Sequence, residues 1–247
     1  MKYTASFFKH TMPEWKRKKD SLIARVFHRP ISFYFSSFFA EIGLTPNQVS
    51  FISLIISIMS CGCFAFDKRI AHIIGAILIN VWSITDSADG NMARSIGGNP
   101  YGDFIDATSS YVMVGFLLPM LGWATYRNGG LFFQKGDGLI ILIGAIAGIS
   151  DTMSRLFFQK MKCNSYEQNG GEVIFPEDSV SEESSIKKIY NRIESEIGLG
   201  GWNMLAILIC AFLNIFDIYV VFYAIYYGLM FLVSTVYLIK KTNCLKN

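Results

Sequence analysis

The chain has 247 residues, of which 52% are hydrophobic and only 17% are charged, and its formal net charge is +3. A water-soluble domain of this length does not need so apolar a composition for its core, so an ordinary soluble protein is excluded and a membrane protein is expected. The basic residues fit a membrane topology, and they give no basis for nucleic-acid binding.

The N-terminal segment precedes the long apolar runs. Its first 20 residues are basic and lack an apolar stretch, so we expect no cleavable signal peptide. The sequence PISFYFSSFFAEIGL at 30–44 follows basic residues and predicts an amphipathic helix in the membrane interface, its basic flank facing anionic headgroups. Residues 1–45 are therefore expected to be a cytoplasmic segment with an interfacial helix.

Six apolar segments follow, each near the roughly 20 residues that a membrane-spanning helix needs. They lie at 46–66, 70–85, 107–124, about 138–158, 198–216 and 218–239. The predicted fold class is all-α integral membrane, with six transmembrane helices that an N-terminal interfacial helix precedes. This membrane domain covers 46–240 and contains a cytoplasmic insertion at about 159–197, and 241–247 form a cytoplasmic tail.

The distribution of Lys and Arg predicts the orientation. With the N-terminus inside, 18 of the 22 Lys and Arg residues fall on the cytoplasmic side and four fall outside. This positive-inside bias places both termini in the cytoplasm of a multi-pass protein. The polar connection between the second and third spans is then also cytoplasmic.

Four aspartates lie in and around that connection. The stretch DSADGNMARSIGGNPYGDFID at 86–106 contains Asp86, Asp89, Asp103 and Asp106. At about 100° per residue, the first pair shares one helical face at the end of the second span. The second pair shares a face at the start of the third span, with Ser110 one turn further. Two acidic faces are therefore expected to meet at the cytoplasmic edge of the membrane.

The aspartates suit a divalent cation. Carboxylates that face one another repel unless cations neutralise them or some are protonated. Oxygen clusters suit Mg²⁺, Mn²⁺ or Ca²⁺, and Mg²⁺ commonly shares its coordination with substrate phosphates. Arg94 shares the face of Asp86 and Asp89 and is suited to a phosphate, while Gly90 and Ala93 leave room for a ligand. The pattern predicts metal-assisted phosphoryl transfer. The alternative is solvated or helix-capping residues at two helix ends.

These residues resemble the signature of the CDP-alcohol phosphotransferase family, which is D-x2-D-G-x2-A-R, then about eight residues, then G-x3-D-x3-D. The first part is present in full. The second part corresponds to Gly102 and Asp106 after seven intervening residues, and its final aspartate is replaced by Ser110. The segment 29–51 also resembles the family's interfacial helix and its Pro-Asn entry into the first span. Six spans with a cytoplasmic site match the family's architecture.

The resemblance implies a role for each matching position. The family holds two divalent cations, Mg²⁺ or Mn²⁺, which bind the diphosphate of a CDP-alcohol donor. The metal ligands implied here are Asp86, Asp89 and Asp106. The residues implied to line the CDP site are Asn47, Gly90, Ala93, Arg94 and Gly102. The resemblance also implies a homodimer.

The base position departs from the family. The family's final aspartate is taken to be the general base, and the hydroxyl of Ser110 cannot take up a proton near neutral pH. Asp103 is one replacement, because it shares the face of Asp106 about one turn nearer the cytoplasm. Three alternatives stay open: Asp103 or another acid is the base, the acceptor arrives ionised or metal-activated, or activity has been lost. The catalytic candidates are Asp103 and Ser110.

A second charged pair lies in the fourth span. Asp151 and Arg155 are four residues apart, which a simple salt bridge along one helix explains. The alternative is that Arg155 recognises a phosphate on the acceptor, which would suit a site where two phosphorylated substrates meet.

The leading hypothesis is an integral membrane transferase of phospholipid or related lipid or glycopolymer biosynthesis. It moves a substituted phosphate from a CDP-alcohol to a hydroxyl acceptor and releases CMP, and at least one substrate is lipid-linked. The alternative is a catalytically degenerate nucleotide- or lipid-binding protein of the same fold. A cation carrier is a third hypothesis, but its acids would more naturally lie near the midplane of discontinuous helices.

Overall fold

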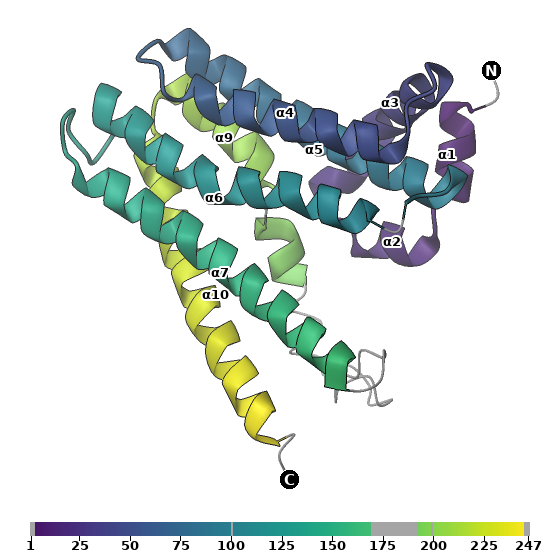
Figure 1. Ribbon diagram of the computed structural model, residues 1–247. Coiled ribbons are helices and arrows are strands. Elements are labelled where there is room, and N and C mark those ends of the chain that lie inside the picture. Colours follow the sequence, from purple (N-terminus) through teal and green to yellow (C-terminus); the bar gives the residue numbers. More distant parts are fainter. Residues whose placement is uncertain (1–2, 100, 169–191, 199, 245–247) are drawn as a thin grey trace.

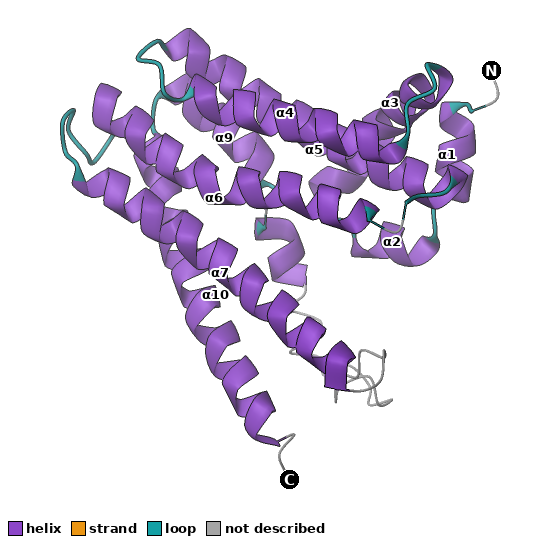
Figure 2. Ribbon diagram, in the orientation of Figure 1, coloured by secondary structure: helices purple, strands orange, loops and turns teal. Residues whose placement is uncertain are grey.

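The computed structural model describes residues 3–99, 101–168, 192–198 and 200–244. In these ranges every regular element is a helix, which confirms the all-α fold class (Figure 2). The predicted insertion at about 159–197 falls mostly on residues 169–191, which lie outside the described ranges. Its first part is helical, because the preceding helix continues to Gln168.

Five helices are long and apolar enough to cross a membrane. They are α4 (Pro46–Cys63), α5 (Arg69–Ile96), α6 (Gly102–Asn128), α7 (Leu139–Gln168) and α10 (Phe216–Cys244). The expected fifth span corresponds instead to α9 (Asn203–Leu213), whose 11 residues extend only about 16 Å. The multi-pass membrane class is therefore confirmed, and a sixth complete span is not.

The start of α4 follows from local chemistry. Thr45 accepts a hydrogen bond from the backbone amide of Gln48, and the Gln48 side chain accepts one from the backbone of Thr45. This capping box satisfies amides that the first turn of a helix leaves without partners. Pro46 occupies the first turn, where its missing amide hydrogen costs nothing. The chain therefore enters the membrane region at a fixed position.

The main core lies between the long helices. α4 packs against both α5 and α6, α7 packs between α6 and α10, and α9 packs against α5. Trp82, Met113, Leu121, Ile207 and Tyr219 are among its buried side chains. Figure 1 shows α7 and α10 side by side, running downward and away from the direction of α4, α5 and α6.

Glycines bring α6 and α7 into close contact. A Cβ atom at Gly144 would collide with the carbonyl oxygen of Leu118, and one at Gly148 would lie 2.9 Å from the carbonyl oxygen of Gly115. The two α7 glycines are four residues apart, the small-residue spacing that lets membrane helices approach closely. The backbones can pack at this distance because neither position carries a side chain.

We expect Gly144→Ala to lower the free energy of unfolding by about 1–3 kcal/mol, because a rigid backbone carbonyl must move to admit the methyl group. Denaturant titration in mixed micelles measures the change. Gly228→Ala is the matched control, since a Cβ there meets nothing within 4 Å. Equal stability of Gly144→Ala and the parent would contradict the close helix contact.

The N-terminal segment forms four short elements: α1 (Ala5–Thr11), α2 (Glu14–Lys19), the π-helical turn η1 (Ala24–His28) and α3 (Arg29–Glu41). α3 packs against α1 and α5. Buried Phe8, Phe33, Val49 and Met92 are members of a second apolar cluster there. The outer face of α3 exposes Tyr34, Phe38 and Ile42, as a helix in the membrane interface requires. This cluster fixes the N-terminal helices against the end of α5 that carries the signature.

His28 joins η1 to α5. Its imidazole is buried and its Nε2 lies 3.2 Å from Oδ1 of Asn80, whose amide donates to the carbonyl oxygen of Met204 in α9. Burial lowers the pKa of His28 below its usual 6.5, chiefly because the charged ring would lose its hydration. The folded protein therefore holds His28 neutral.

Stability should consequently fall as the pH drops below about 6.5, where the unfolded chain takes up a proton that the folded chain resists. We expect the apparent melting temperature in detergent to decrease between pH 7 and pH 5. In His28→Gln this part of the decrease should be absent. An unchanged pH profile in the variant would show that His28 does not cause it.

Candidate active site

Three signature carboxylates meet where the end of α5 faces the start of α6. Asp89 is buried, Asp86 is half-buried and Asp106 is exposed. The carboxyl groups of Asp86 and Asp106 interact directly, and Asp89 lies within electrostatic range of both. Asp103, in the first turn of α6, is exposed and lies close enough to act on Asp106. The two predicted acidic faces are therefore brought together.

A row of serines on α4 forms one wall beneath the carboxylates. Ser50 donates a 2.6 Å hydrogen bond to Oδ2 of Asp89. Deeper along the same face, Ser53 lies 2.9 Å from Ser109 of α6, whose Oγ also accepts from Nε1 of Trp82 in α5 at 2.8 Å. These contacts tie the three helices together below the site. The polar face of α4 therefore holds Asp89 in place and aligns α6 with α5.

The residues implied for CDP lie around these carboxylates. A Cβ at Gly90 would lie 3.1 Å from Nη1 of Arg94, so the guanidinium lies against the bare backbone of α5. A Cβ at Gly102 would lie 3.3 Å from Oδ1 of Asn47, which places the first turn of α4 beside the start of α6. Ala93 is half-buried next to Gly98. Gly90 and Gly102 therefore leave the helix backbone uncovered beside the side chains of Arg94 and Asn47.

A buried polar network that the sequence did not predict supports Arg94. Arg29 donates two 2.9 Å hydrogen bonds to the carboxylate of Asp20, and both side chains are buried. Arg29 also donates to Oδ1 of Asn91 at 3.2 Å, and Arg94 donates to the same oxygen at 3.1 Å. The amide of Asn91 donates to Ser32 of α3 at 3.0 Å. The N-terminal helices therefore position the signature arginine through Asn91.

Lys16 of α2 is a further residue of this site. Its Nζ lies 3.8 Å from Oδ1 of Asp20, and its charge acts on both Asp86 and Asp106. Lys16 therefore brings a positive charge to the acidic cluster. No periodicity in the sequence indicates this contact.

The signature carboxylates are the candidate metal ligands of this site. Over the described ranges, no three His, Cys, Asp or Glu side chains form a group that could hold a metal ion as they are arranged. The donor set nevertheless fits a hard divalent cation, because three carboxylates come together and Oδ1 of Asp86 is buried without a hydrogen-bond partner. The carboxylates concerned are Asp86, Asp89 and Asp106.

The remaining candidates lie further along α6 and α7. Ser110 is half-buried in the third turn of α6, where its side chain offers a hydroxyl and not a carboxylate. Arg155 of α7 donates a 2.9 Å hydrogen bond to Oδ1 of buried Asp151, so the predicted salt bridge is present. About a third of the Arg155 side chain stays exposed, which leaves it accessible to a ligand.

Comparison with known proteins shows similarity to one family and to a curated protein. Residues 43–161 match the family model described as CDP-alcohol phosphatidyltransferase. The segment that carries the signature, from the start of α4 into α7, is therefore similar to that family, and the predicted resemblance is confirmed. A phosphatidylinositol phosphate synthase of Streptomyces avermitilis is 31% identical over 108 residues, which make up 43% of this chain and 43% of that protein. The match thus spans less than half the length of that relative.

Proposed function

We propose that the chain is a metal-dependent membrane transferase that moves a substituted phosphate from a CDP-alcohol to a hydroxyl acceptor and releases CMP. The observation that carries this proposal is the meeting of Asp86 and Asp89 from α5 with Asp106 from α6, beside Arg94. An acidic cluster next to a guanidinium and bare glycine backbone suits a divalent cation shared with a diphosphate. The family match of the same segment supports it.

The reaction forms one bond and breaks one. The acceptor oxygen attacks the phosphorus that carries the donor's alcohol, and the bond from that phosphorus to the phosphate of CMP breaks. The acceptor's hydroxyl proton passes to a base. Two Mg²⁺ or Mn²⁺ ions bound to Asp86, Asp89 and Asp106 would neutralise the diphosphate and the leaving CMP. Arg94, held by Asn91, orients a donor phosphate, and Asn47 with Gly90, Ala93 and Gly102 admits the nucleotide.

Asp103 is the proposed base. It is exposed in the first turn of α6 and acts on Asp106, whereas Ser110 offers only a hydroxyl. Lys16 supplies a positive charge to the same cluster and is proposed to face the donor's phosphates together with Arg94.

A phosphorylated polyol is the proposed acceptor, with a lipid-linked CDP-alcohol as the donor. The relative from Streptomyces avermitilis is named for the synthesis of phosphatidylinositol phosphate. Arg155 is the proposed partner of the acceptor phosphate, because its guanidinium is held at one end by Asp151 and remains partly exposed. The proposed site faces the cytoplasm, both termini lie on that side, and the protein forms a homodimer.

The proposal is tested by measuring CMP release from the purified full chain in nanodiscs. The assay supplies Mg²⁺ or Mn²⁺, lipid-linked and soluble CDP-alcohols, and acceptors with and without a phosphate. We expect CMP release that depends on the metal ion. Arg155→Met should weaken this release for the phosphorylated acceptor and leave it unchanged for the acceptor without a phosphate. Loss of release in Asp103→Asn with metal binding intact would support Asp103 as the base.

A second candidate function is that of a nucleotide- or lipid-binding protein without transferase activity. It is favoured by the serine at position 110, where the family signature has its final aspartate. In that case the parent releases no CMP from any donor, and Ser110→Asp gains release. CDP binding measured by calorimetry would then persist in the parent and depend on the divalent cation.

A further inference from the structure

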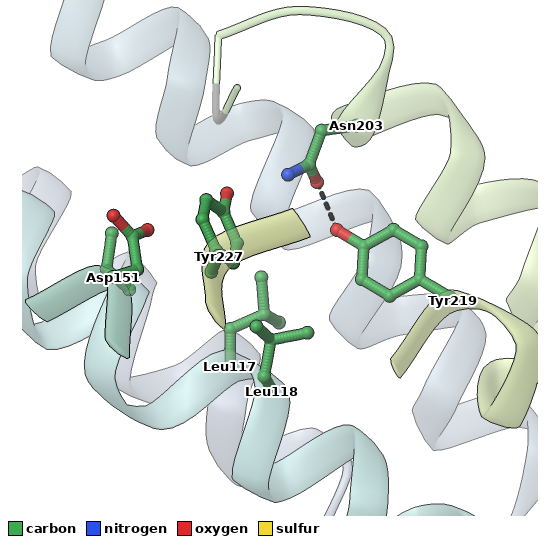
Figure 3. A pocket seen from close by; sticks show the side chains of 7 residues that line it. Leu117, Leu118, Asp151, Asn203, Tyr219 and Tyr227 are labelled. Atoms are coloured by element: carbon green, nitrogen blue, oxygen red, sulfur yellow. Dashed lines mark hydrogen bonds between the residues drawn. The ribbon is translucent and has the colours of Figure 1, made fainter. Parts of the chain in front are cut away.

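A small polar cavity lies in the interior of the helix bundle, among α6, α7, α9 and α10. Its volume is about 10 Å³. The apolar side of the wall is formed by Val114, Leu117 and Leu118 of α6, and the polar side by Asp151, Asn203, Tyr219 and Tyr227. Figure 3 shows the polar side chains arranged around it, with Tyr219 donating to the side-chain oxygen of Asn203.

Two polar atoms of this wall lack partners. Oδ2 of Asp151 and the hydroxyl of Tyr227 are both buried without a hydrogen bond to the protein. Their residues are only 6% and 7% exposed. In a membrane interior no bulk solvent reaches such groups, so each would raise the free energy of the folded state unless something binds it. Both unpartnered groups belong to the same cavity.

We propose that this cavity binds one water molecule, which donates a hydrogen bond to Oδ2 of Asp151 and accepts one from the hydroxyl of Tyr227. The volume is about that of a single water site. Charge favours a neutral ligand over a cation, because the other oxygen of Asp151 already accepts a 2.9 Å hydrogen bond from Nε of Arg155. The buried pair is therefore close to neutral as a unit.

The water has a consequence for Arg155. Asp151 is held at Oδ1 by Arg155 and, in the proposal, at Oδ2 by the water on Tyr227, so the carboxylate cannot rotate freely. Tyr227 then acts as a positioning residue for the guanidinium through Asp151. This consequence rests on the proposed role of Arg155 at the acceptor phosphate, whereas the water site itself does not.

The sign of the thermal shift in Tyr227→Phe tests the water site. If the cavity is dry, the variant removes a buried hydroxyl without a partner, and the melting temperature stays equal or rises. If water is bound, a hydrogen bond is lost and the melting temperature falls by about 2–4 °C. Tyr223→Phe is the matched control, because its hydroxyl donates to the carbonyl oxygen of Ile197 at 2.9 Å and its loss lowers the melting temperature in either case.

The melting temperature of a second variant is an independent test. Val114→Ile adds one methyl group to the cavity wall. In a dry cavity the added group fills a void and stabilises the protein, whereas in a hydrated cavity it expels the water and leaves Asp151 and Tyr227 without partners. A lower melting temperature in both Val114→Ile and Tyr227→Phe is expected. An equal or higher value in either would overturn the proposal.

Replacing choline by sodium in the buffer tests for a bound cation. A melting temperature that rises in the parent, and not in Asp151→Asn, would identify a bound cation and also overturn the proposal.

Steady-state kinetics with the phosphorylated acceptor test the positioning of Arg155 separately. Tyr227→Phe is expected to raise the acceptor KM about tenfold with kcat unchanged, and an unchanged KM would refute the positioning role. A chain that releases no CMP with any donor would refute the proposed function, and the thermal results would still decide the water site.

Discussion

Asp89→Asn is expected to reduce metal-dependent CMP release by about 10³-fold or more, since a ligand charge at the phosphoryl-transfer site is lost. Asparagine keeps the shape of the side chain and an oxygen that can accept the hydrogen bond of Ser50. The variant therefore removes charge with little change in packing, and its melting temperature should stay near that of the parent. Initial rates of CMP release under saturating donor measure the effect.

Asp137→Asn is the control for this experiment. Asp137 lies in the connection between α6 and α7, and its side-chain oxygen accepts from the amide of Leu139 at 3.0 Å, a role that asparagine can keep. Its rate should equal that of the parent. A rate for Asp89→Asn within tenfold of the parent would show that this carboxylate is not a metal ligand, and the transferase proposal would lose its main support.

Arg29→Met is expected to lower the free energy of unfolding by about 3–5 kcal/mol, because buried Asp20 loses both hydrogen bonds from Arg29 and keeps only Lys16, at 3.8 Å, as a charged neighbour. The pair is nearly inaccessible, with Arg29 at 7% and Asp20 at 6% exposure. Asn91 would also lose a donor. Denaturant unfolding in micelles measures the loss. In the double variant Asp20→Leu with Arg29→Met, much of the lost stability should return, since neither position then carries a buried charge and Lys16 is partly exposed.

The exposed pair of Arg127 with Asp67 provides the contrast. These side chains also form an ion pair, but both are in contact with solvent. The hydrogen bond from Arg127 lowers the pKa of Asp67, and surface pairs of this kind contribute little to stability. Arg127→Met should therefore unfold at nearly the same denaturant concentration as the parent. Equal losses in Arg29→Met and Arg127→Met would show that burial does not decide the importance of the pair.

The long helices could be predicted from the sequence because each contains an apolar run near spanning length. α9 could not, because the apolar run at 198–216 contains features that only the backbone reveals. Its helix begins after the Gly200–Gly201 turn, and it ends where Asn214 adopts a left-handed conformation with φ of 57°. Composition alone does not show where such breaks fall.

The acidic cluster could be predicted because its residues are close in sequence and helical geometry places them on two facing surfaces. The residues that hold this cluster and Arg94 in place could not be predicted. Asp20, Arg29 and Asn91 come from separate elements, and only the tertiary fold brings them to Arg94. Two local signals were available: the buried serines of α4 recur on one face at positions 50, 53, 57 and 60, and α7 carries glycines four residues apart.

The lengths of α7 and α10 have a consequence for the bilayer around the protein. With 30 and 29 residues, each measures about 45 Å, half as long again as a hydrocarbon layer of about 30 Å. This hydrophobic mismatch is relieved by tilt or by protrusion into the headgroup region. The last turns of α7 carry Lys160 and Lys162, whereas α10 stays apolar as far as Ile239. We therefore expect the end of α7 to lie in the headgroup region or in water and the end of α10 to stay in contact with lipid.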